Sequence, residues 1–519
     1  MTGYWRCLSL SLRTGWPQVL GWPLMVAALV VASAATINGT YPDRASRDRY
    51  AGAYELLDGS AALQGRGYDL NTLGGILVNE MGYLTLIMIP LIGVHLAIRF
   101  TRSVEDTGRL DILTSYPVHR LAPAAAGVTA AAFTAALTAL ITATGLTALG
   151  FPLGGSGRYA GGLAMFMVVF IGIGTLVAQC CRTARTAYLL ATGIWLISYL
   201  ARAAVDAQQW DAAGWNPQSW LAEIRPFAAD PPLWPWIASG ALAVGLLAAT
   251  AAVAARRDQG AGIIAPRPGP ATAPGWVRSP LTLLLRLTAG IGVGWVGASA
   301  LFAFAFGYLT PQINHLDAAT QVDHDATVNA TLAIFVQLNA LLAAAAGIQI
   351  AQWLAAEETS GRVGYSLSTV VSRWRWWTSA TLLVTVWSLL VLLCGGLSTG
   401  LGLVAGFGEG HYFGKGLTAT LSYTAAVVLL IGGAVAVHSL SPRAVPVAWL
   451  PVGWGIVVCL RADLLELPSW ARQLSPVHWI GAVPRDAWHR PAALTMTAVA
   501  ILLVAVSTVR YRWRDLEAG

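Results

Sequence analysis

Twelve long apolar runs divide this chain of 519 residues, and they constrain its fold more than any other feature. Each run is about 20 residues or longer, the length that an α-helix needs to cross the hydrocarbon core of a bilayer. Inside that core every backbone N–H and C=O must be paired within the segment, so each run folds as a helix. The runs lie at residues 18–38, 74–98, 122–149, 159–181, 186–205, 233–255, 287–309, 329–354, 377–402, 416–437, 444–462 and 490–510. The sequence therefore predicts an all-α integral membrane protein of about 12 transmembrane helices, multi-pass in the cell (plasma) membrane.

Composition and charge support this class and set the orientation. Hydrophobic residues make up 56% of the chain and charged residues only 11%, too few for the surface of a water-soluble protein. The net charge of +7 suits a basic cytoplasmic rim better than nucleic-acid binding, because the basic residues are spread along the connecting segments. Of the 32 Arg and Lys residues, 20 lie on the side that holds both termini. We expect the N- and C-termini to be cytoplasmic and no nucleic acid to be bound.

A Gly- and Pro-rich stretch separates the sixth run from the seventh. No helical period survives in "RPGPATAP", and residues 259–276 therefore form a predicted cytoplasmic linker. The expected domains are a first six-helix half at 18–258 and a second half within 277–519. Six crossings return the chain to the same side, so both halves have the same orientation in the membrane.

The two halves carry a repeated polar segment. "EDTGRLDILTSYPVHR", from Glu105 to Arg120, recurs as "ETSGRVGYSLSTVVSR", from Glu358 to Arg373, at a constant offset of 253 residues. The identical pairs include Glu105 with Glu358, Gly108 with Gly361, Arg109 with Arg362, Ser115 with Ser368, Val118 with Val371 and Arg120 with Arg373. Each copy follows the second helix of its half, on the predicted cytoplasmic side. The halves are predicted to be two six-helix repeats.

Weaker pairs agree with the duplication. "NPQSWL" and "LSPVHWI" each place a Pro three residues before a Trp, ahead of the last helix of a half. Directly after that helix, "ARRD" near Ala255 matches "RWRD" near Arg512.

Within each copy, an acidic and a basic residue stand four positions apart, Glu105 with Arg109 and Glu358 with Arg362. Such pairs stabilise a helix by about 0.3–0.5 kcal/mol and carry no chemistry. An apolar stripe follows at helical spacing. It comprises Leu110, Leu113 and Tyr116 in one copy and Val363, Leu367, Val370 and Val371 in the other. The stripe packs either on lipid headgroups and neighbouring loops or on a protein partner, and its duplication favours a partner present in two copies.

The polar E-(E/D)-x-G-R segment with its "PVxR" or "VVSR" ending resembles the permeases of the ABC-2-type exporter family. The fused 6+6 layout is similar to the actinobacterial branch that exports tetronasin and other polyketide antibiotics or drugs. The likeness includes "WRCLSLSLRTGW", "YPDRASRDRY", "SWLAEIRPFA", the linker and "RWRDLEAG". By this resemblance, residues 1–17 form an N-terminal interfacial elbow helix, and the second half, 277–519, begins with a second elbow.

In that family the segment after the second helix of each half is a coupling helix that docks on a separately encoded ABC ATPase. The resemblance implies two copies of this partner, which would hold ATP and Mg²⁺, and no cofactor in this chain. The implied ATPase-facing positions are Glu105, Asp106, Gly108, Arg109, Leu113, Arg120, Glu357, Glu358, Gly361, Arg362, Leu367 and Arg373. The second copy departs from the first, with Gly364 and Ser366 in place of Asp111 and Leu113, so the two docking surfaces are expected to differ.

No enzyme motif stands out. The Gly-Lys at Gly414-Lys415 lacks both the preceding Gly and the following Ser or Thr of a phosphate-binding loop, so the chain is not expected to be an enzyme or to bind ATP in that way. The cysteines and the "DHD" at Asp323 to Asp325 have no convincing metal spacing, and no metal site is expected.

Polar residues at membrane depth usually face a bundle interior or water. Candidates for lining a substrate pathway are Asn79, Glu80, Tyr83, Gln337 and Asn339. Hydrogen bonding between helices is the competing explanation. It is the better one for Asn339 and His95, whereas Glu80 is better explained by the pathway.

The expected function is that of a permease subunit of an ATP-driven exporter for hydrophobic or amphipathic compounds, such as drugs, polyketide-type antibiotics or lipids. The second and eighth helices would line the pathway. The main alternative is a proton-coupled secondary transporter, which shares the 6+6 layout but has more acidic residues at membrane depth. A non-transporting membrane scaffold is the third possibility.

Overall fold

A computed structural model describes residues 2–55, 61, 64–108, 110, 115–208, 210, 213–258, 261–263, 272–313, 324–462 and 465–515. These residues form helices and connecting segments, with no strand among them. Twelve of the described helical segments are long and apolar enough to cross a membrane, which confirms the twelve predicted spans. The described chain divides into two compact units, Met1–Gly269 and Pro270–Gly519, each with six of these spans.

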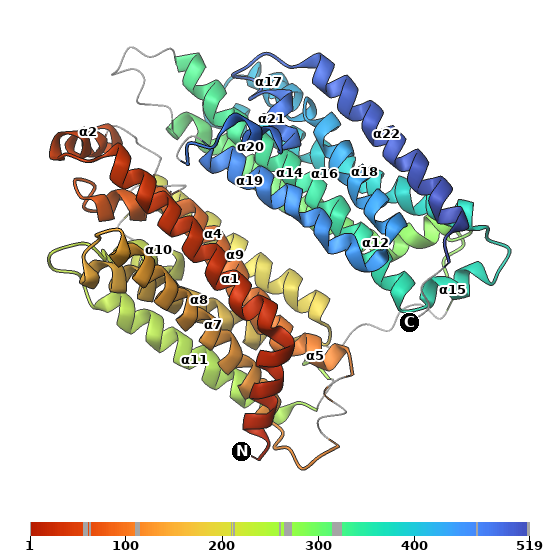
Figure 1. Ribbon diagram of the computed structural model, residues 1–519, viewed down its shortest axis with the longest axis horizontal. Helices are drawn as coiled ribbons and strands as arrows, with labels where there is room; N and C mark the ends of the chain where they lie inside the picture. The colour runs from red at the N-terminus through yellow and green to blue at the C-terminus, as the bar shows by residue number, and fades with distance from the viewer. Residues whose placement is uncertain are drawn as a thin grey trace. The chain divides into compact units, whose positions relative to one another are not determined.

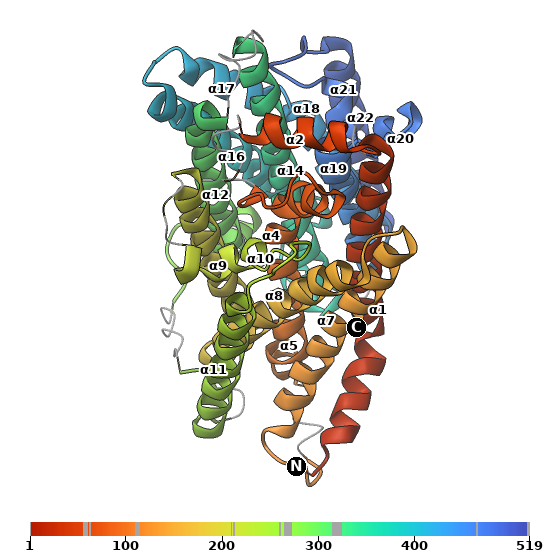
Figure 2. The same cartoon turned by 90° about the vertical axis from the view of Figure 1, so that its left-hand side faces the viewer.

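The first unit begins with α1 (Tyr4–Thr40), whose C-terminal end leads into the short α2 (Arg44–Glu55). Its second span is α4 (Leu73–Phe100), continued by α5 (Arg102–Asp106). The remaining spans are α7 (Ala122–Ala148), α8 (Leu153–Cys180), α9 (Ala184–Ala207) and α11 (Trp234–Arg256). Two short helices, η1 (Ala213–Trp215) and α10 (Pro217–Glu223), precede the last span. In Figure 2, α2 runs across the direction of α1.

The second unit also has six spans, and two of them consist of two consecutive helices. Its first three spans are α12 (Pro280–Ile313), α14 (His324–Thr359) and α16 (Arg373–Phe407), with the short α15 (Arg362–Leu367) before α16. The fourth consists of α17 (Tyr412–Leu421) and α18 (Thr424–Leu440), and the fifth of η2 (Pro442–Ala448) and α19 (Trp449–Arg461). After α20 (Ser469–Gln473) and α21 (Pro476–Ile480), α22 (Arg490–Trp513) ends the unit beside α15 (Figure 1).

Side-chain caps fix where several spans begin. The hydroxyls of Thr72, Thr183 and Ser372 accept hydrogen bonds from the third backbone N–H of α4, α9 and α16. Each cap satisfies an N–H that has no partner inside its own helix. These caps place the first turn of each span at a defined residue.

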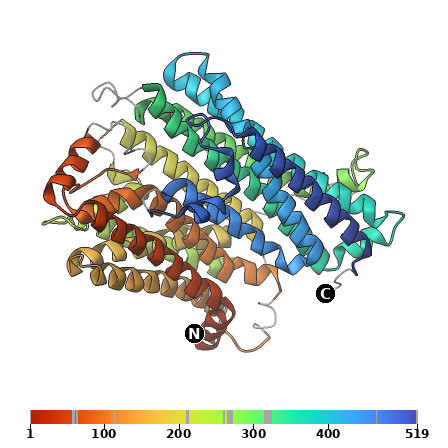
Figure 3. The same ribbon diagram turned by 45° about the horizontal axis from the view of Figure 1, so that its top comes forward.

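The second span of each half, α4 or α14, packs against most of its own unit. In the first unit α4 contacts α1, α7, α8 and α9, and in the second α14 contacts α12, α16, α18 and α19. Glycines allow the closest approaches: a side chain at Gly402 in α16 would lie 2.3 Å from the Phe304 carbonyl of α12. Small residues at such crossings let membrane helices pack backbone to backbone. Figure 3 shows α22 running alongside the second unit, where it packs on α18.

One expected boundary has no counterpart in the described helices. Residues 4–17, expected as a separate elbow, continue into the first span as one helix of 37 residues, with Pro17 and Pro23 inside it. Each Pro removes one backbone hydrogen bond and crowds the carbonyl four residues earlier, a cost that membrane helices tolerate, and the helix continues through both. The location of its first turns at a membrane interface stays a prediction.

Candidate functional site

In the first unit, the polar segment begins with a buried ion pair. Glu105, on α5, accepts a hydrogen bond from Arg102 at 2.7 Å and another from Arg257 at 3.0 Å. Only 9% of the Glu105 side chain and 8% of the Arg257 side chain are exposed. Arg257 directly follows the last span, α11. The end of the second span is therefore joined to the end of the sixth.

Arg257 has further partners that hold it in place. Its Nε donates to Gln179 Oε1 at 2.7 Å, near the end of α8. Its backbone carbonyl accepts a hydrogen bond from Arg120 at 3.0 Å, just before α7. Glu105 and Arg120, the first and last residues of the polar segment, thus both bind the same arginine.

The second unit has the same arrangement at the equivalent residues. Glu358, with 2% of its side chain exposed, pairs with Arg514, which directly follows the last span α22. The Arg514 carbonyl accepts from Arg373 at 2.8 Å. His438, near the end of α18, lies 3.1 Å from the other oxygen of Glu358. Here too, the first and last residues of the segment meet on one arginine.

In the second unit, these contacts replace the local pair of Glu358 with Arg362 that the spacing predicted. Glu358 does not pair with Arg362: Arg362 instead makes two hydrogen bonds of 2.7 Å to Glu357, in a more exposed pair. The prediction of an i,i+4 pair at Glu358 was wrong, because Arg362 donates from both Nε and Nη2 to Glu357, five residues earlier. Arg109 and Leu113 lie outside the described residues.

Other predicted positions have local structural roles. The Asp106 carboxylate accepts from the Ala184 N–H at 2.6 Å and so caps the first turn of α9. Gly108 and Gly361 have φ values of +69° and +76°, in the left-handed region that favours glycine. At both glycines the space around a side chain is open. The glycines thus shape the turn that each segment makes after its helix.

The predicted apolar stripe divides between the core and the surface. Leu110 and Val363 are buried, and Leu367 and Val371 pack partly against the core of the second unit. Tyr116, Tyr365 and Val370 are exposed, at 67%, 80% and 101%. The described tip of the first segment therefore exposes Tyr116 and that of the second exposes Tyr365 and Val370, whereas the side chains of Glu105 and Glu358 are only 9% and 2% exposed.

In the first unit, the predicted pathway residues Asn79 and Glu80 bind side chains of the segment between α1 and α4. Tyr50 of α2 donates a hydrogen bond to Glu80 at 2.7 Å, and the buried Asn79 donates to Tyr50 at 2.9 Å and to Gln64 at 3.1 Å. Burial, together with the Glu80 carboxylate, raises the pKa of Tyr50, so its hydroxyl remains a donor. Tyr83 is half-buried one turn further along α4. Glu80 thus takes part in packing α2 onto the second span.

In the second unit, the predicted pathway residues link helices to one another. Asn339 of α14 is buried and accepts from Ser299 of α12 at 2.6 Å. Gln337 donates to Tyr423 at 3.2 Å, and Tyr423 donates to the Gly481 carbonyl at 2.6 Å. The interhelical explanation for Asn339 agrees with these contacts. In the first unit His95 likewise lies 3.1 Å from the Tyr188 hydroxyl of α9.

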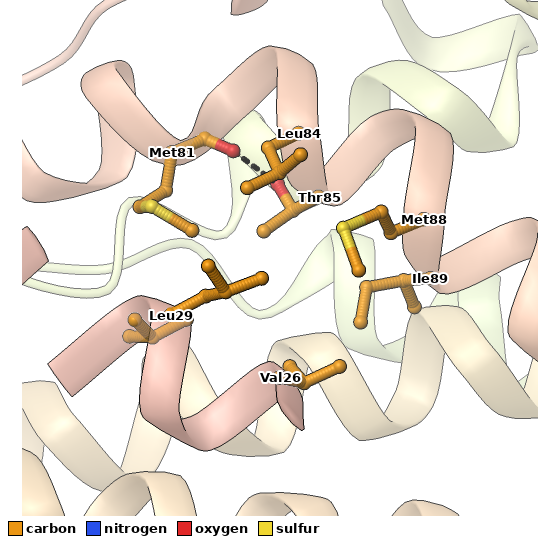
Figure 4. Close-up of a pocket in the computed structure, with 8 residues that line it drawn as sticks. Val26, Leu29, Met81, Leu84, Thr85, Met88 and Ile89 are labelled. Atoms are coloured by element: carbon orange, nitrogen blue, oxygen red, sulfur yellow. Dashed lines mark hydrogen bonds between the residues drawn. The ribbon is translucent and has the colours of Figure 1, made fainter. Parts of the chain in front are cut away.

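A small cavity lies between α1 and α4 in the first unit. Figure 4 shows its apolar lining, with Met81 and Met88 of α4 opposite Val26 and Leu29 of α1. Its volume is about 10 Å³, roughly the space of one water molecule. A drug-sized compound does not fit this cavity in the conformation described.

Two residues of the site, Arg257 and Arg514, were not among the predicted site residues. The signal that could have found them is the match between "ARRD" and "RWRD", which had suggested only a repeat. Among the described residues, no group of three or more His, Cys, Asp or Glu side chains could hold a metal ion. Asp323, in the "DHD" sequence, lies outside them.

The fold and the site define a class: an all-α, multi-pass protein of the cell membrane with twelve spans, whose two units carry equivalent ion-paired segments.

Comparison with known proteins finds a similar membrane permease. The chain is 28% identical over 532 aligned positions to the multidrug efflux system permease protein Rv1217c of Mycobacterium tuberculosis (strain ATCC 25618 / H37Rv). The alignment covers 99% of this chain and 96% of the relative. Residues 277–512 also match the family model described as the C-terminal domain of multidrug efflux system permease Rv1217c. The similarity therefore extends over both units.

Proposed function

We propose that the chain is the permease subunit of an efflux system that moves hydrophobic or amphipathic compounds out of the cytoplasm or the inner leaflet. The full-length similarity to a multidrug efflux permease and the twelve spans support transport as the role of the chain. Such a subunit moves a substrate across the membrane, and another polypeptide hydrolyses the ATP.

We further propose that two copies of an ABC ATPase, holding ATP and Mg²⁺, bind the segments after the second and eighth spans. The observation that carries this proposal is the pair of exposed apolar tips, Tyr116 in one unit and Tyr365 with Val370 in the other. Tyrosine is among the residue types that supply much of the energy of a protein interface when a partner covers them. The tips differ in composition, so the two docking surfaces are not equivalent.

Replacing the tips tests the docking proposal. In the variant Tyr365→Ser/Val370→Ser, and separately in Tyr116→Ser, we expect less ATPase to co-purify with the permease and ATP-driven export to fall in proportion. Trp470→Ser is the matched control, because Trp470 is 66% exposed and lies on α20, at the opposite end of the second unit (Figure 1). Unchanged co-purification in both tip variants would contradict docking at these residues.

A proton-coupled transporter gives a different response to the loss of the ion gradient. With ATP present and the gradient collapsed by an uncoupler, the proposed exporter keeps transporting. If export stops under that condition and survives the depletion of ATP with the gradient clamped, the proton-coupled alternative is correct.

A further inference from the structure

In both units, the same arrangement of three residues joins the two ends of the polar segment, which we call its neck. Glu105, Arg120 and Arg257 form it in the first unit, and Glu358, Arg373 and Arg514 form it in the second. We call each set a neck clamp. In each clamp the guanidinium of the last arginine binds the glutamate, while its backbone carbonyl accepts from the other arginine.

The two clamps have the same three residue types, but different neighbouring side chains complete their hydrogen bonding. In the first unit Arg102 and Gln179 complete the hydrogen bonding, whereas in the second His438 takes this place. A buried pair of charges is costly to form, and apolar side chains of similar size can hold helices together equally well. The recurrence of the charged triad in two different environments therefore points to a role beyond helix packing.

The connectivity suggests what that role is. Each segment leaves the second span at its glutamate and enters the third span at its arginine, and both ends are fixed to the first residue after the last span. A force applied to the segment would reach the sixth span of its unit directly. Movement of the segment without the last span would require a buried carboxylate to lose its partner, which is strongly unfavourable.

We propose that the neck clamps are positioning devices that make each segment and the last span of its unit, α11 or α22, move together during transport. Arg257 and Arg514 are the positioning residues, and they act through the segment rather than by contacting substrate or ATPase. This inference rests on the proposed function, because it takes the segments to be the places where ATPase movement enters the permease.

The first test measures coupling in the assembled complex. Glu105→Gln and Glu358→Gln keep the size of the side chain and remove its charge. We expect export per assembled complex to fall about tenfold, within the range of typical coupling free energies, while ATPase association and ATP turnover stay within about twofold. A purely structural role would instead lower association, turnover and export together. Asp48→Asn, which removes the exposed Arg44–Asp48 pair on α2, is the matched control and should leave all three unchanged.

The second test needs no ATPase. In the purified permease, Glu358→Gln should increase hydrogen–deuterium exchange at the backbone amides of residues 508–515, because the last turn of α22 is released. Unchanged exchange there, export within twofold of the unmodified protein, or loss of ATPase association in parallel with export would each overturn the clamp. If the unmodified complex shows no ATP-driven export but the exchange still increases, the proposed function fails and the physical linkage between segment and span remains.

Discussion

At the scale of single residues, the buried carboxylates carry the largest energies. Glu358 is paired with Arg514 and hydrogen-bonded by His438, so its removal leaves a mostly buried guanidinium without its counter-charge. Breaking one partner of such a pair costs about 3–5 kcal/mol, whereas an exposed pair contributes about 0–1 kcal/mol. Glu358 is therefore expected to contribute much more to the free energy of unfolding than its neighbour Glu357.

This contrast gives a stability prediction. Glu358→Ala should lower the free energy of unfolding by about 3–5 kcal/mol, and Arg362→Ala, which breaks only the exposed pair with Glu357, by less than about 1 kcal/mol. The measurement is thermal or denaturant unfolding of both variants in the same detergent. Equal losses of unfolding free energy would show that the contribution of Glu358 to stability does not come from its pairing with Arg514.

The left-handed glycines predict an effect of backbone conformation. At Gly361, with φ of +76° and open space around a Cβ atom, side-chain size is not the obstacle. Gly361→Val should destabilise the turn by about 1–2 kcal/mol, and Gly361→Asn by clearly less, because Asn enters this region more easily. Unfolding measurements on the two variants check this order. Equal effects of Asn and Val would contradict the conformational explanation.

Tyr68 predicts a pH dependence outside the membrane spans. Its hydroxyl donates to Glu223 at 2.5 Å, and burial, followed by this hydrogen bond, raises its pKa to about 12. In the unfolded chain a tyrosine has a pKa of about 10, so folding favours the neutral form of Tyr68. The stability that Tyr68 contributes is full below pH 10 and is lost as the pH rises through about 12.

Comparison with Tyr68→Phe isolates this contribution. The difference in unfolding free energy between the two proteins should be constant below pH 10 and shrink between pH 10 and about 12. In a spectrophotometric titration, the variant should lack one tyrosine that ionises near pH 12. Ionisation of Tyr68 near 10 would contradict the burial and hydrogen bonding described.

At the scale of helices, the second unit depends on a polar contact between three spans. Asn339 of α14 binds Ser299 of α12 and lies against Gly395 of α16. A Cβ atom at Gly395 would be only 2.0 Å from the Asn339 amide nitrogen, so the helices must separate or the hydrogen bond must break. Small residues and interhelical hydrogen bonds act together at this crossing.

Gly395→Ala should therefore destabilise the second unit, and the double variant Gly395→Ala/Asn339→Ala should recover part of the loss by removing the clash. Gly433→Ala is a suitable control, because open space surrounds Gly433 on α18. Unfolding of the variants measures the effect. Additive losses in the double variant would mean that the two residues are not coupled.

Most of the helices could be predicted from the sequence, because the length and hydropathy of a span are local properties of the chain. The continuity of α1 through residues 4–17 could not, since an interfacial helix and the first turns of a span have similar composition. The partners of Glu105 and Glu358 could not be predicted by spacing, because Arg257 and Arg514 are distant in sequence. Only the matching "ARRD" and "RWRD" sequences marked them.

At the scale of the whole molecule, two units of six spans each carry one exposed apolar tip above one neck clamp. Under the proposed function, the tip receives a soluble ATPase, and the clamp ties the tip's segment to the last span of its unit. Under the proposed function, ATP hydrolysis in two partner subunits would supply the energy for transport, through two similar but non-equivalent docking contacts.

Transport assays in vesicles that contain the permease and its candidate ATPase test directly whether ATP hydrolysis drives export. Substrate movement is measured with ATP, with a non-hydrolysable ATP analogue, and with ATP plus an uncoupler. If a partner ATPase drives the permease, substrate moves in the first and third conditions and not in the second. Transport that persists without hydrolysis and stops with the uncoupler would contradict ATP-driven export.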